Sequence, residues 1–272
     1  MTKEKYILHL ADGIQLNYYQ WGNGAEHLLA FHGFGQDGLL FKPMIAGLSN
    51  QYTIYSFNIF FHGGSIWPFG EQPLTKDHWL TILQSFFEEK GIDRFSMAGY
   101  SLGGRFALVT TEMLAAKIDH LILLAPDGIK TSFWYSFATY PLLIRKLFKR
   151  SINKPGLFFT LNKVLGTLGV MDKGLLKFTS KQMDTPEKRH RVYYSWIVFR
   201  KMIYQPSTIA RIINSHGVST HVFLGRYDKV ITPESVKGWI GQLENCHPHI
   251  LEVGHNDLVV ATADRLDDVS EK

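Results

Sequence analysis

The sequence predicts an α/β protein with a mostly parallel central sheet, helices on both faces of the sheet and a helical insertion. Short, nearly continuous apolar runs alternate with helical patterns over most of the chain, as is typical of strands that are covered on both faces. The alternation stops between Asp127 and about Asn214, where the chain becomes basic and aromatic. We therefore expect this interval to be an insertion into the part of the chain that forms the sheet.

The strands are expected where turn residues bound the apolar runs. Residues 5–20 alternate apolar and polar side chains around an Ala-Asp-Gly turn, which predicts a β-hairpin. Buried strands are then expected at 27–33, 52–58, 94–100, 120–126, 220–226 and 249–255. Helical patterns lie between them at 75–89, 102–116 and 233–243, and the last begins with a proline after Thr232, a suitable N-cap.

The charge of the chain also divides it into two parts. Residues 129–212 contain 16 Lys and Arg against 3 Asp and Glu, a net charge of +13, whereas the remainder carries a net charge of −8. Opposite charges in two regions indicate two structural units. We predict a core made of residues 1–128 and 213–272, with residues 129–212 as a helical cap. The cap is expected over the carboxyl ends of the strands, where ligands bind in open α/β sheets.

The composition excludes several classes of protein. Of the 272 residues, 45% are hydrophobic and 19% are charged, which predicts a large buried core rather than disorder. The first residues are charged and lack the apolar segment of a secretory signal, and no run approaches the roughly 18 apolar residues that cross a membrane. Cys246 is the single cysteine, so no internal disulfide forms. We expect a soluble, cytoplasmic protein.

One short motif carries the first indication of chemistry. Residues 97–106 read MAGYSLGGRF, with Ser101 between Gly99 and Gly103. An expected strand precedes this turn and an expected helix follows it, which is the setting of a nucleophilic serine exposed on a sharp turn. Glycines relieve crowding at such a turn, and the helix N-terminus favours developing negative charge. Ser101 is the candidate nucleophile.

A serine hydroxyl needs a base, and the base needs a carboxylate that fixes its tautomer. His255 follows the last expected strand, and Asp228 follows the strand before it. The chain order Ser101, Asp228, His255 therefore places all three at strand ends on one edge of the sheet. Asp127 also follows an expected strand and is the alternative acid.

These residues, in this order, make the chain resemble the α/β-hydrolase superfamily, in particular its cap-bearing esterase and lipase-like members. The resemblance implies an oxyanion hole formed by backbone N–H groups, which match Phe34 in FHGFGQD and Leu102 after the nucleophile. Family members often have an aspartate after the next strand, where this chain has Asn58 in FNIFFHGGS. That departure does not affect a catalytic position.

The expected function is that of a serine hydrolase acting on an ester or related acyl bond of a small, largely apolar substrate. His255 would accept the proton of Ser101, Asp228 would orient the imidazole, and an acyl-serine would form and be hydrolysed. Carbon–carbon bond hydrolases, lyases and a cofactor-free synthase branch of the family keep the same three residues, so they stay open as alternatives. A non-catalytic ligand-binding protein is the alternative from another class.

Several other patterns in the sequence suggest further kinds of site. Residues 33–38, GFGQDG, fit a dinucleotide-binding motif, but Asn58 stands where such a site wants an acidic residue, so we expect no cofactor. His32 and His62 are expected to stabilise turns or line a pocket rather than act as a base. No metal-ligand spacing and no nucleic-acid-binding signature occurs, so neither a metal nor a nucleic-acid partner is expected.

The insertion has two further candidate roles. Its aromatic residues Phe133, Trp134 and Phe137 are candidates for lining the substrate pocket, or they form the core of the cap. Its basic residues Arg145, Lys146, Lys149 and Arg150 alternate with apolar ones, which is consistent with a solvated helix face or with weak contact of a basic amphipathic helix with anionic lipid.

Overall fold

The computed structural model describes residues 4–130, 142–153, 156, 160 and 182–265. These residues form two compact units. The larger unit takes in residues 1–68, 75–130 and 202–272, and the smaller unit takes in residues 69–74 and 131–201. Within the described ranges, no helix has both the length and the apolar character that crossing a membrane requires.

The larger unit is built on a mixed sheet. Within the described residues, eight strands form it in the order β1-β2-β4-β3-β5-β6-β7-β8. β1 and β2 pair antiparallel, as do β2 and β4, and every other neighbouring pair is parallel. The predicted α/β fold with a mostly parallel sheet is therefore confirmed. The strands are β1 (Glu4–His9), β2 (Gln15–Trp21), β3 (Glu26–Phe31), β4 (Tyr52–Phe57), β5 (Phe95–Tyr100), β6 (Ile118–Leu124), β7 (Ser219–Gly225) and β8 (Cys246–Leu251).

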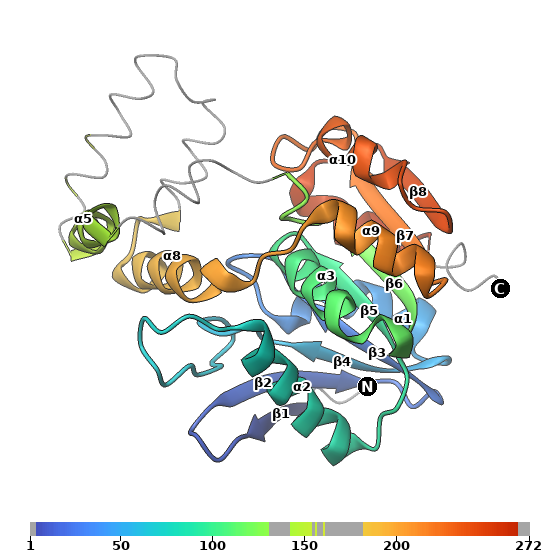
Figure 1. The fold of residues 1–272 in the computed structure, drawn as a ribbon, viewed down its shortest axis with the longest axis horizontal. Helices are drawn as coiled ribbons and strands as arrows, with labels where there is room; N and C mark the ends of the chain where they lie inside the picture. The colour runs from blue at the N-terminus through green and yellow to red at the C-terminus, as the bar shows by residue number, and fades with distance from the viewer. Residues whose placement is uncertain (1–3, 131–141, 154–155, 157–159, 161–181, 266–272) are drawn as a thin grey trace. The chain divides into compact units, whose positions relative to one another are not determined.

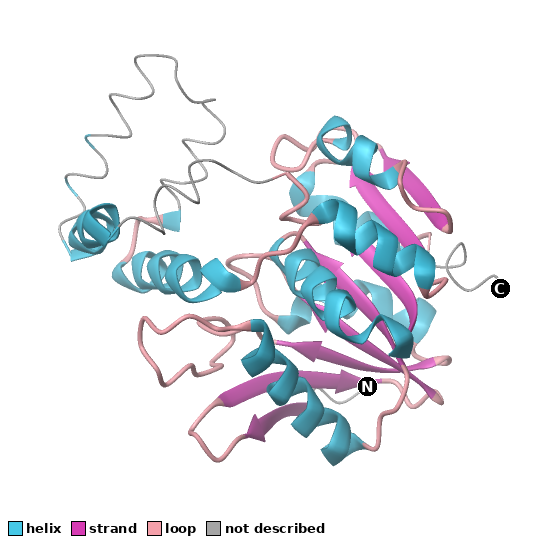
Figure 2. Ribbon diagram, in the orientation of Figure 1, coloured by secondary structure: helices cyan, strands magenta, loops and turns pink. Residues whose placement is uncertain are grey.

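Helices cover both faces of this sheet, as the apolar runs predict. α2, α3 and α9 lie next to one another on one face (Figures 1 and 2). The helices of the larger unit are α1 (Ile45–Leu48), α2 (Lys76–Lys90), α3 (Leu102–Leu114), α9 (Pro206–Ser215), α10 (Pro233–Ile240) and α11 (Leu258–Ala263). Three short 3₁₀ segments accompany them: η1 (Gly38–Met44), η2 (Ala115–Lys117) and η4 (His255–Asp257).

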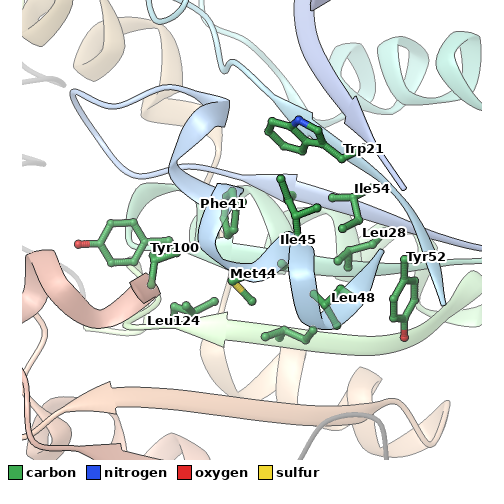
Figure 3. Close-up of a cluster of buried hydrophobic side chains, with 14 of the residues drawn as sticks. Trp21, Leu28, Phe41, Met44, Ile45, Leu48, Tyr52, Ile54, Tyr100 and Leu124 are labelled. Carbon is green, nitrogen blue, oxygen red and sulfur yellow. The ribbon is translucent and has the colours of Figure 1, made fainter. Parts of the chain in front are cut away.

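Alternate residues of a single strand supply the core on both faces. Phe31 at the end of β3 packs against Trp79 of α2 and Phe106 of α3, with ring centroids 5.7 and 6.4 Å away. Leu28 and Ala30 of the same strand belong to a different cluster of buried side chains (Figure 3). That cluster includes Ile45 and Leu48 of α1 and Leu258 of α11. Since residues i and i+2 of a strand point to one face, the two clusters lie on opposite faces.

The last strand is the one predicted least accurately. It was expected at residues 249–255 and occupies Cys246–Leu251 instead. Pro248 lies inside it, and proline indicates a strand end unless the strand is at a sheet edge. β8 is such an edge strand. As a result, His255 does not end a strand but begins the 3₁₀ turn η4.

The smaller unit contains α5 (Leu142–Asn153), α8 (Pro186–Val198) and η3 (Phe199–Lys201). Ile152 of α5 is buried with Tyr193 and Ile197 of α8. The Arg189 guanidinium crosses between the two helices, because its Nε donates to the Ile152 carbonyl at 2.9 Å. These contacts make α5 and α8 a packed helix pair.

Residues 69–74 belong to this unit although they are distant from it in sequence. The Leu74 amide donates to the Val198 carbonyl at 2.9 Å, and Glu71 forms an ion pair with Lys149. The hydrogen bond that Lys149 donates to this carboxylate raises the pKa of Lys149.

The boundaries of the units differ from those expected at the C-terminal side of the insertion. The cap was predicted to end at residue 212, but α9 is grouped with the larger unit. It packs against α3 and α10, and the Trp239 indole of α10 donates to the Pro206 carbonyl at its start, at 2.9 Å. Basic and aromatic composition therefore places the end of the insertion at residue 212, whereas the smaller unit ends at residue 201.

Candidate active site

The turn between β5 and α3 presents Ser101 in a strained conformation. Ser101 has φ 51° and ψ −116°, and such a backbone costs on the order of 1–3 kcal/mol in a residue other than glycine. Backbone hydrogen bonds stabilise Ser101 in this conformation. Its amide donates to the Leu124 carbonyl of β6 at 2.9 Å, and its own carbonyl accepts from the Gly104 amide at 2.9 Å. The local strand-turn-helix arrangement matches the one expected for an exposed nucleophile.

The glycines beside Ser101 are needed for close packing. A Cβ added at Gly103 would lie 1.8 Å from the Phe31 carbonyl oxygen, and one at Gly99 would lie 2.7 Å from the Gly103 oxygen. A Cβ at Gly104 would lie 2.7 Å from the Pro126 Cα. The helix that follows the serine can approach β3 and β6 this closely only because these positions carry no side chain.

We expect Gly103→Ala to lower the free energy of unfolding by more than about 3 kcal/mol, because backbone atoms cannot yield to the new methyl group as flexible side chains can. Denaturant unfolding followed by circular dichroism measures this change. Gly238→Ala in α10 is the matched control, since an added Cβ meets nothing within 4 Å there and alanine favours the helix. Equal unfolding free energies for the two variants would contradict the prediction.

The structure brings the three predicted side chains into one hydrogen-bonded chain. His255 Nε2 lies 3.1 Å from Ser101 Oγ, and His255 Nδ1 lies 2.6 Å from Asp228 Oδ2. The Asp228 side chain is fully buried, and its other oxygen accepts from the amides of Val230 and Ile231 at 2.7 and 2.9 Å. A carboxylate can only accept here, so Nδ1 of His255 carries the proton and Nε2 faces the serine hydroxyl as an acceptor.

The alternative acid, Asp127, has different partners. Its carboxylate forms an ion pair with Arg105 of α3. Its amide donates to the Ser101 carbonyl at 2.9 Å, and its carbonyl accepts from the Tyr204 hydroxyl at 2.9 Å. In this structure the histidine is therefore bonded to Asp228, and Asp127 supports the turn through its backbone.

The turn that carries Phe34 is held by two side chains from the segment after β4. The Gly35 amide donates to His62 Nε2 at 2.9 Å, and the Gly38 amide donates to Asn58 Oδ1 at 2.7 Å. The Phe34 ring stands edge-on to the His62 ring, with centroids 5.4 Å apart. Leu102, the other expected oxyanion donor, is the first residue of α3, where an amide has no acceptor within its own helix.

His32 and His62 both hold turns by the same pattern. In each ring Nε2 accepts from a backbone amide, of Ile59 at 3.1 Å and of Gly35 at 2.9 Å. In each ring Nδ1 faces a backbone carbonyl, of Gly33 at 2.7 Å and of Phe60 at 3.0 Å. Both imidazoles are thus neutral with the proton on Nδ1, and both contact backbone turns, as expected.

Sequence reasoning overlooked two contributions to this region. Asn58 is a departure from the family pattern, yet its amide oxygen anchors the turn at Gly38. Tyr100, the residue before the serine, donates its hydroxyl proton to the His255 carbonyl at 2.7 Å. A hydrogen bond to a backbone atom distant in sequence leaves no pattern of residue types, so only the folded chain reveals it.

Two other expectations from the sequence concern the lining of the substrate pocket and a metal site. Phe133, Trp134 and Phe137, the candidates for the pocket lining, lie outside the described residues. In the portion of the chain that the structure describes, no group of three or more His, Cys, Asp or Glu side chains is arranged to hold a metal ion.

Comparison with known proteins finds similarity to a lipase and to an esterase. The human (lyso)-N-acylphosphatidylethanolamine lipase is 31% identical over 108 residues, which are 39% of this chain and 32% of that protein. The pimeloyl-[acyl-carrier protein] methyl ester esterase of Legionella pneumophila is 24% identical over 252 residues, 87% of this chain and 93% of that protein. The chain spans about a third of the length of several of the curated relatives that it matches.

The fold is shared with solved structures at low sequence identity. A hydrolase from Pseudomonas aeruginosa PA01 superimposes with a TM-score of 0.70 at 18% identity, covering 98% of this chain and 99% of that one. The family model described as alpha/beta hydrolase fold matches residues 26–262, from the first residue of β3 to within α11. With the sheet order, the turn at Ser101 and this match in agreement, the chain belongs to the alpha/beta hydrolase family.

Proposed function

We propose that the protein is a serine hydrolase that cleaves an ester or related acyl bond of a small, largely apolar substrate. The observation that carries the proposal is the continuous chain from Ser101 Oγ through His255 to the buried Asp228 carboxylate, with distances of 3.1 and 2.6 Å. Ser101 itself lies on the strained turn between β5 and α3. The turn-holding histidines His32 and His62 have both ring nitrogens on backbone groups, whereas the His255 ring lies between a serine hydroxyl and a carboxylate.

Each residue has a defined part in the proposed mechanism. Ser101 Oγ attacks the carbonyl carbon while His255 Nε2 takes its proton, and Asp228 stabilises the imidazolium that forms. The amides of Phe34 and Leu102 donate to the oxyanion, an interaction that is usually the largest contribution to catalysis. His255 then protonates the leaving alcohol, an acyl-serine remains, and the same histidine activates the water that hydrolyses it.

The relatives support an ester as the scissile bond. The Legionella relative is named as a methyl ester esterase and the human relative as a lipase. The aromatic residues at 133–140 of this sequence are suited to an apolar acyl group. The carbon–carbon bond alternative uses the same three side chains and differs in the bond that is cleaved.

A fluorophosphonate probe tests the reaction class. We expect it to label the wild-type protein on Ser101, identified by mass spectrometry, and to leave Ser101→Ala unlabelled. A graded panel of p-nitrophenyl esters then measures acyl-chain preference. Labelling of Ser101 with no turnover of any ester would favour the carbon–carbon bond alternative, whereas no labelling at all would reject a serine hydrolase.

We also propose a weak attachment of the smaller unit to anionic membranes. The structure restricts the basic residues available for it, because Lys149 is paired with Glu71. Arg145 is half-buried, whereas Lys146 and Arg150 of α5 are exposed. At about 1 kcal/mol for each basic residue near a charged surface, these two provide about 2 kcal/mol. The described apolar residues of α5, Phe148 and Ile152, pack against α8, so the attachment is electrostatic.

Sedimentation with vesicles containing phosphatidylserine measures this attachment. We expect the protein to sediment at low salt and to be released at high salt, because screening weakens the attraction. Lys146→Glu with Arg150→Glu should abolish binding, whereas Lys237→Glu, at an exposed basic residue of α10, should not. Equal sedimentation with neutral vesicles, or none with either kind, would show that the charges only solvate the helix.

A further inference from the structure

Tyr100 lies where three parts of the candidate site meet. It is the last residue of β5 and directly precedes Ser101. Its buried ring lies beside the imidazole of His255, with centroids 5.0 Å apart and planes inclined by 36°. In Figure 3 the Tyr100 side chain stands at the edge of a buried apolar cluster, with its hydroxyl pointing away from the other labelled side chains.

The hydroxyl of Tyr100 has one proton and donates it to the His255 backbone carbonyl at 2.7 Å. Burial, with the nearby charges of Asp228 and Asp257, raises the pKa of Tyr100 well above its ordinary value. The phenol therefore stays protonated at neutral pH. It is a permanent donor and takes no part in moving protons.

His255 lies in a short turn, so no strand pairing fixes its backbone. β8 ends at Leu251, and His255 is the first residue of the turn η4. The preceding chain is fixed by the Tyr227 amide, which donates to the Val253 carbonyl at 3.1 Å. At His255 itself, the carbonyl accepts from the Leu258 amide within the turn and from the Tyr100 hydroxyl, and the side chain is bonded to Asp228.

The same ring also touches the turn expected to form the oxyanion hole. A Cβ added at Gly33 would lie 2.8 Å from both Cδ1 and Cε1 of Tyr100. Gly33 directly precedes Phe34, whose amide is the proposed oxyanion donor. The Tyr100 side chain therefore contacts the backbone of His255 and the turn at Gly33. Tyr100 is also the residue directly before Ser101 in the chain.

We propose that Tyr100 is a positioning residue that holds the general base His255 in line with Ser101, through its hydrogen bond to the His255 carbonyl and the packing of its ring. This inference rests on the serine-hydrolase function proposed above. We expect the hydroxyl to affect the rate of the chemical step and not the binding of the substrate, because the Tyr100 side chain is buried and its hydroxyl is bonded to the His255 backbone.

The test is Tyr100→Phe, which keeps the ring and removes only the donor. We expect kcat for p-nitrophenyl butyrate and the rate constant of fluorophosphonate labelling both to fall about five- to tenfold, the factor that one lost hydrogen bond corresponds to. KM should be unchanged. The low-field NMR signal of the His255 Nδ1 proton should broaden or shift, which a general loss of stability would not cause below the melting temperature.

Tyr52→Phe is the matched control. Tyr52 is a buried tyrosine of the same apolar cluster, at the opposite end of it in Figure 3. Its hydroxyl accepts from the Gln51 side chain at 3.4 Å, and burial raises its pKa to about 12. Removing this hydroxyl should lower stability comparably and leave kcat, the labelling rate and the NMR signal unchanged.

The outcomes separate this inference from the proposed function. If the wild-type protein is labelled and Tyr100→Phe is labelled at the same rate with the same kcat, the positioning role is wrong while the serine hydrolase stands. Equal losses of rate in Tyr52→Phe would also overturn it, because the effect would then come from stability. A wild-type protein that does not react with the probe would overturn the hydrolase, and the role of Tyr100 with it.

Discussion

Replacing Ser101 by alanine is expected to lower the rate of ester hydrolysis by about four to six orders of magnitude, because members of a catalytic triad fail as a unit. His255→Ala should be almost as severe. The fold should survive the first change, since the serine side chain forms no capping hydrogen bond with α3. Alanine meets the same backbone strain at φ 51° that serine already bears.

Hydrolysis of p-nitrophenyl esters and labelling by a fluorophosphonate measure this loss, and far-UV circular dichroism checks the fold. Purification must exclude contaminating esterases, because a trace of another enzyme would hide a loss of this size. The same purification applied to the Gly238→Ala protein sets the activity expected of an intact site. Activity close to that of the wild type in pure Ser101→Ala would end the assignment of the nucleophile.

The second large effect is expected from Asp228→Asn, which should lower kcat by about 10⁴-fold through the wrong histidine tautomer. The oxygen of the new amide can keep the bonds from the Val230 and Ile231 amides, at 2.7 and 2.9 Å. Its NH₂ group then faces His255 Nδ1, which must become an acceptor. Nε2 would carry the proton and could no longer take one from the serine.

Asp127→Asn is the comparison for this variant. The Asp127 carboxylate is paired with the largely buried Arg105, so its loss should lower stability by leaving a guanidinium without its counter-charge. The backbone bonds of Asp127 to Ser101 and Tyr204 do not depend on the carboxylate, and kcat should change little. A collapse of kcat in Asp127→Asn, with activity retained in Asp228→Asn, would exchange the two assignments.

Much of this site could be predicted from the sequence because its parts are local. A strand, a turn with three glycines and a helix are read from neighbouring residues, and parallel strands bring their carboxyl ends to one edge. Ser101, Asp228 and His255 each lie just after such an end, and the structure places their side chains within hydrogen-bonding distance. The predicted bounds of β8 are wrong by several residues. His255 still lies near the end of this strand, because only a short stretch of chain joins Leu251 to it.

The contacts that hold the site in shape could not be predicted in this way. Tyr100, His62 and Asn58 act on backbone groups of residues 20 or more positions away. A backbone amide or carbonyl is the same in every residue, so the sequence gives no sign of which side chain will reach it. The end of the insertion was misplaced because the sequence does not show that α9 packs against α3 and α10 of the larger unit.

The division of the smaller unit between two stretches of chain has a consequence for engineering. Residues 69–74 are separated from 131–201 by α2, β5, α3 and β6, yet Leu74 and Glu71 bond to Val198, Lys149 and Arg200. A chimera that exchanges only the long segment with a relative would leave those partners behind. Recombination between family members should therefore have two crossover pairs, so that the short segment is inherited together with the helices it bonds to.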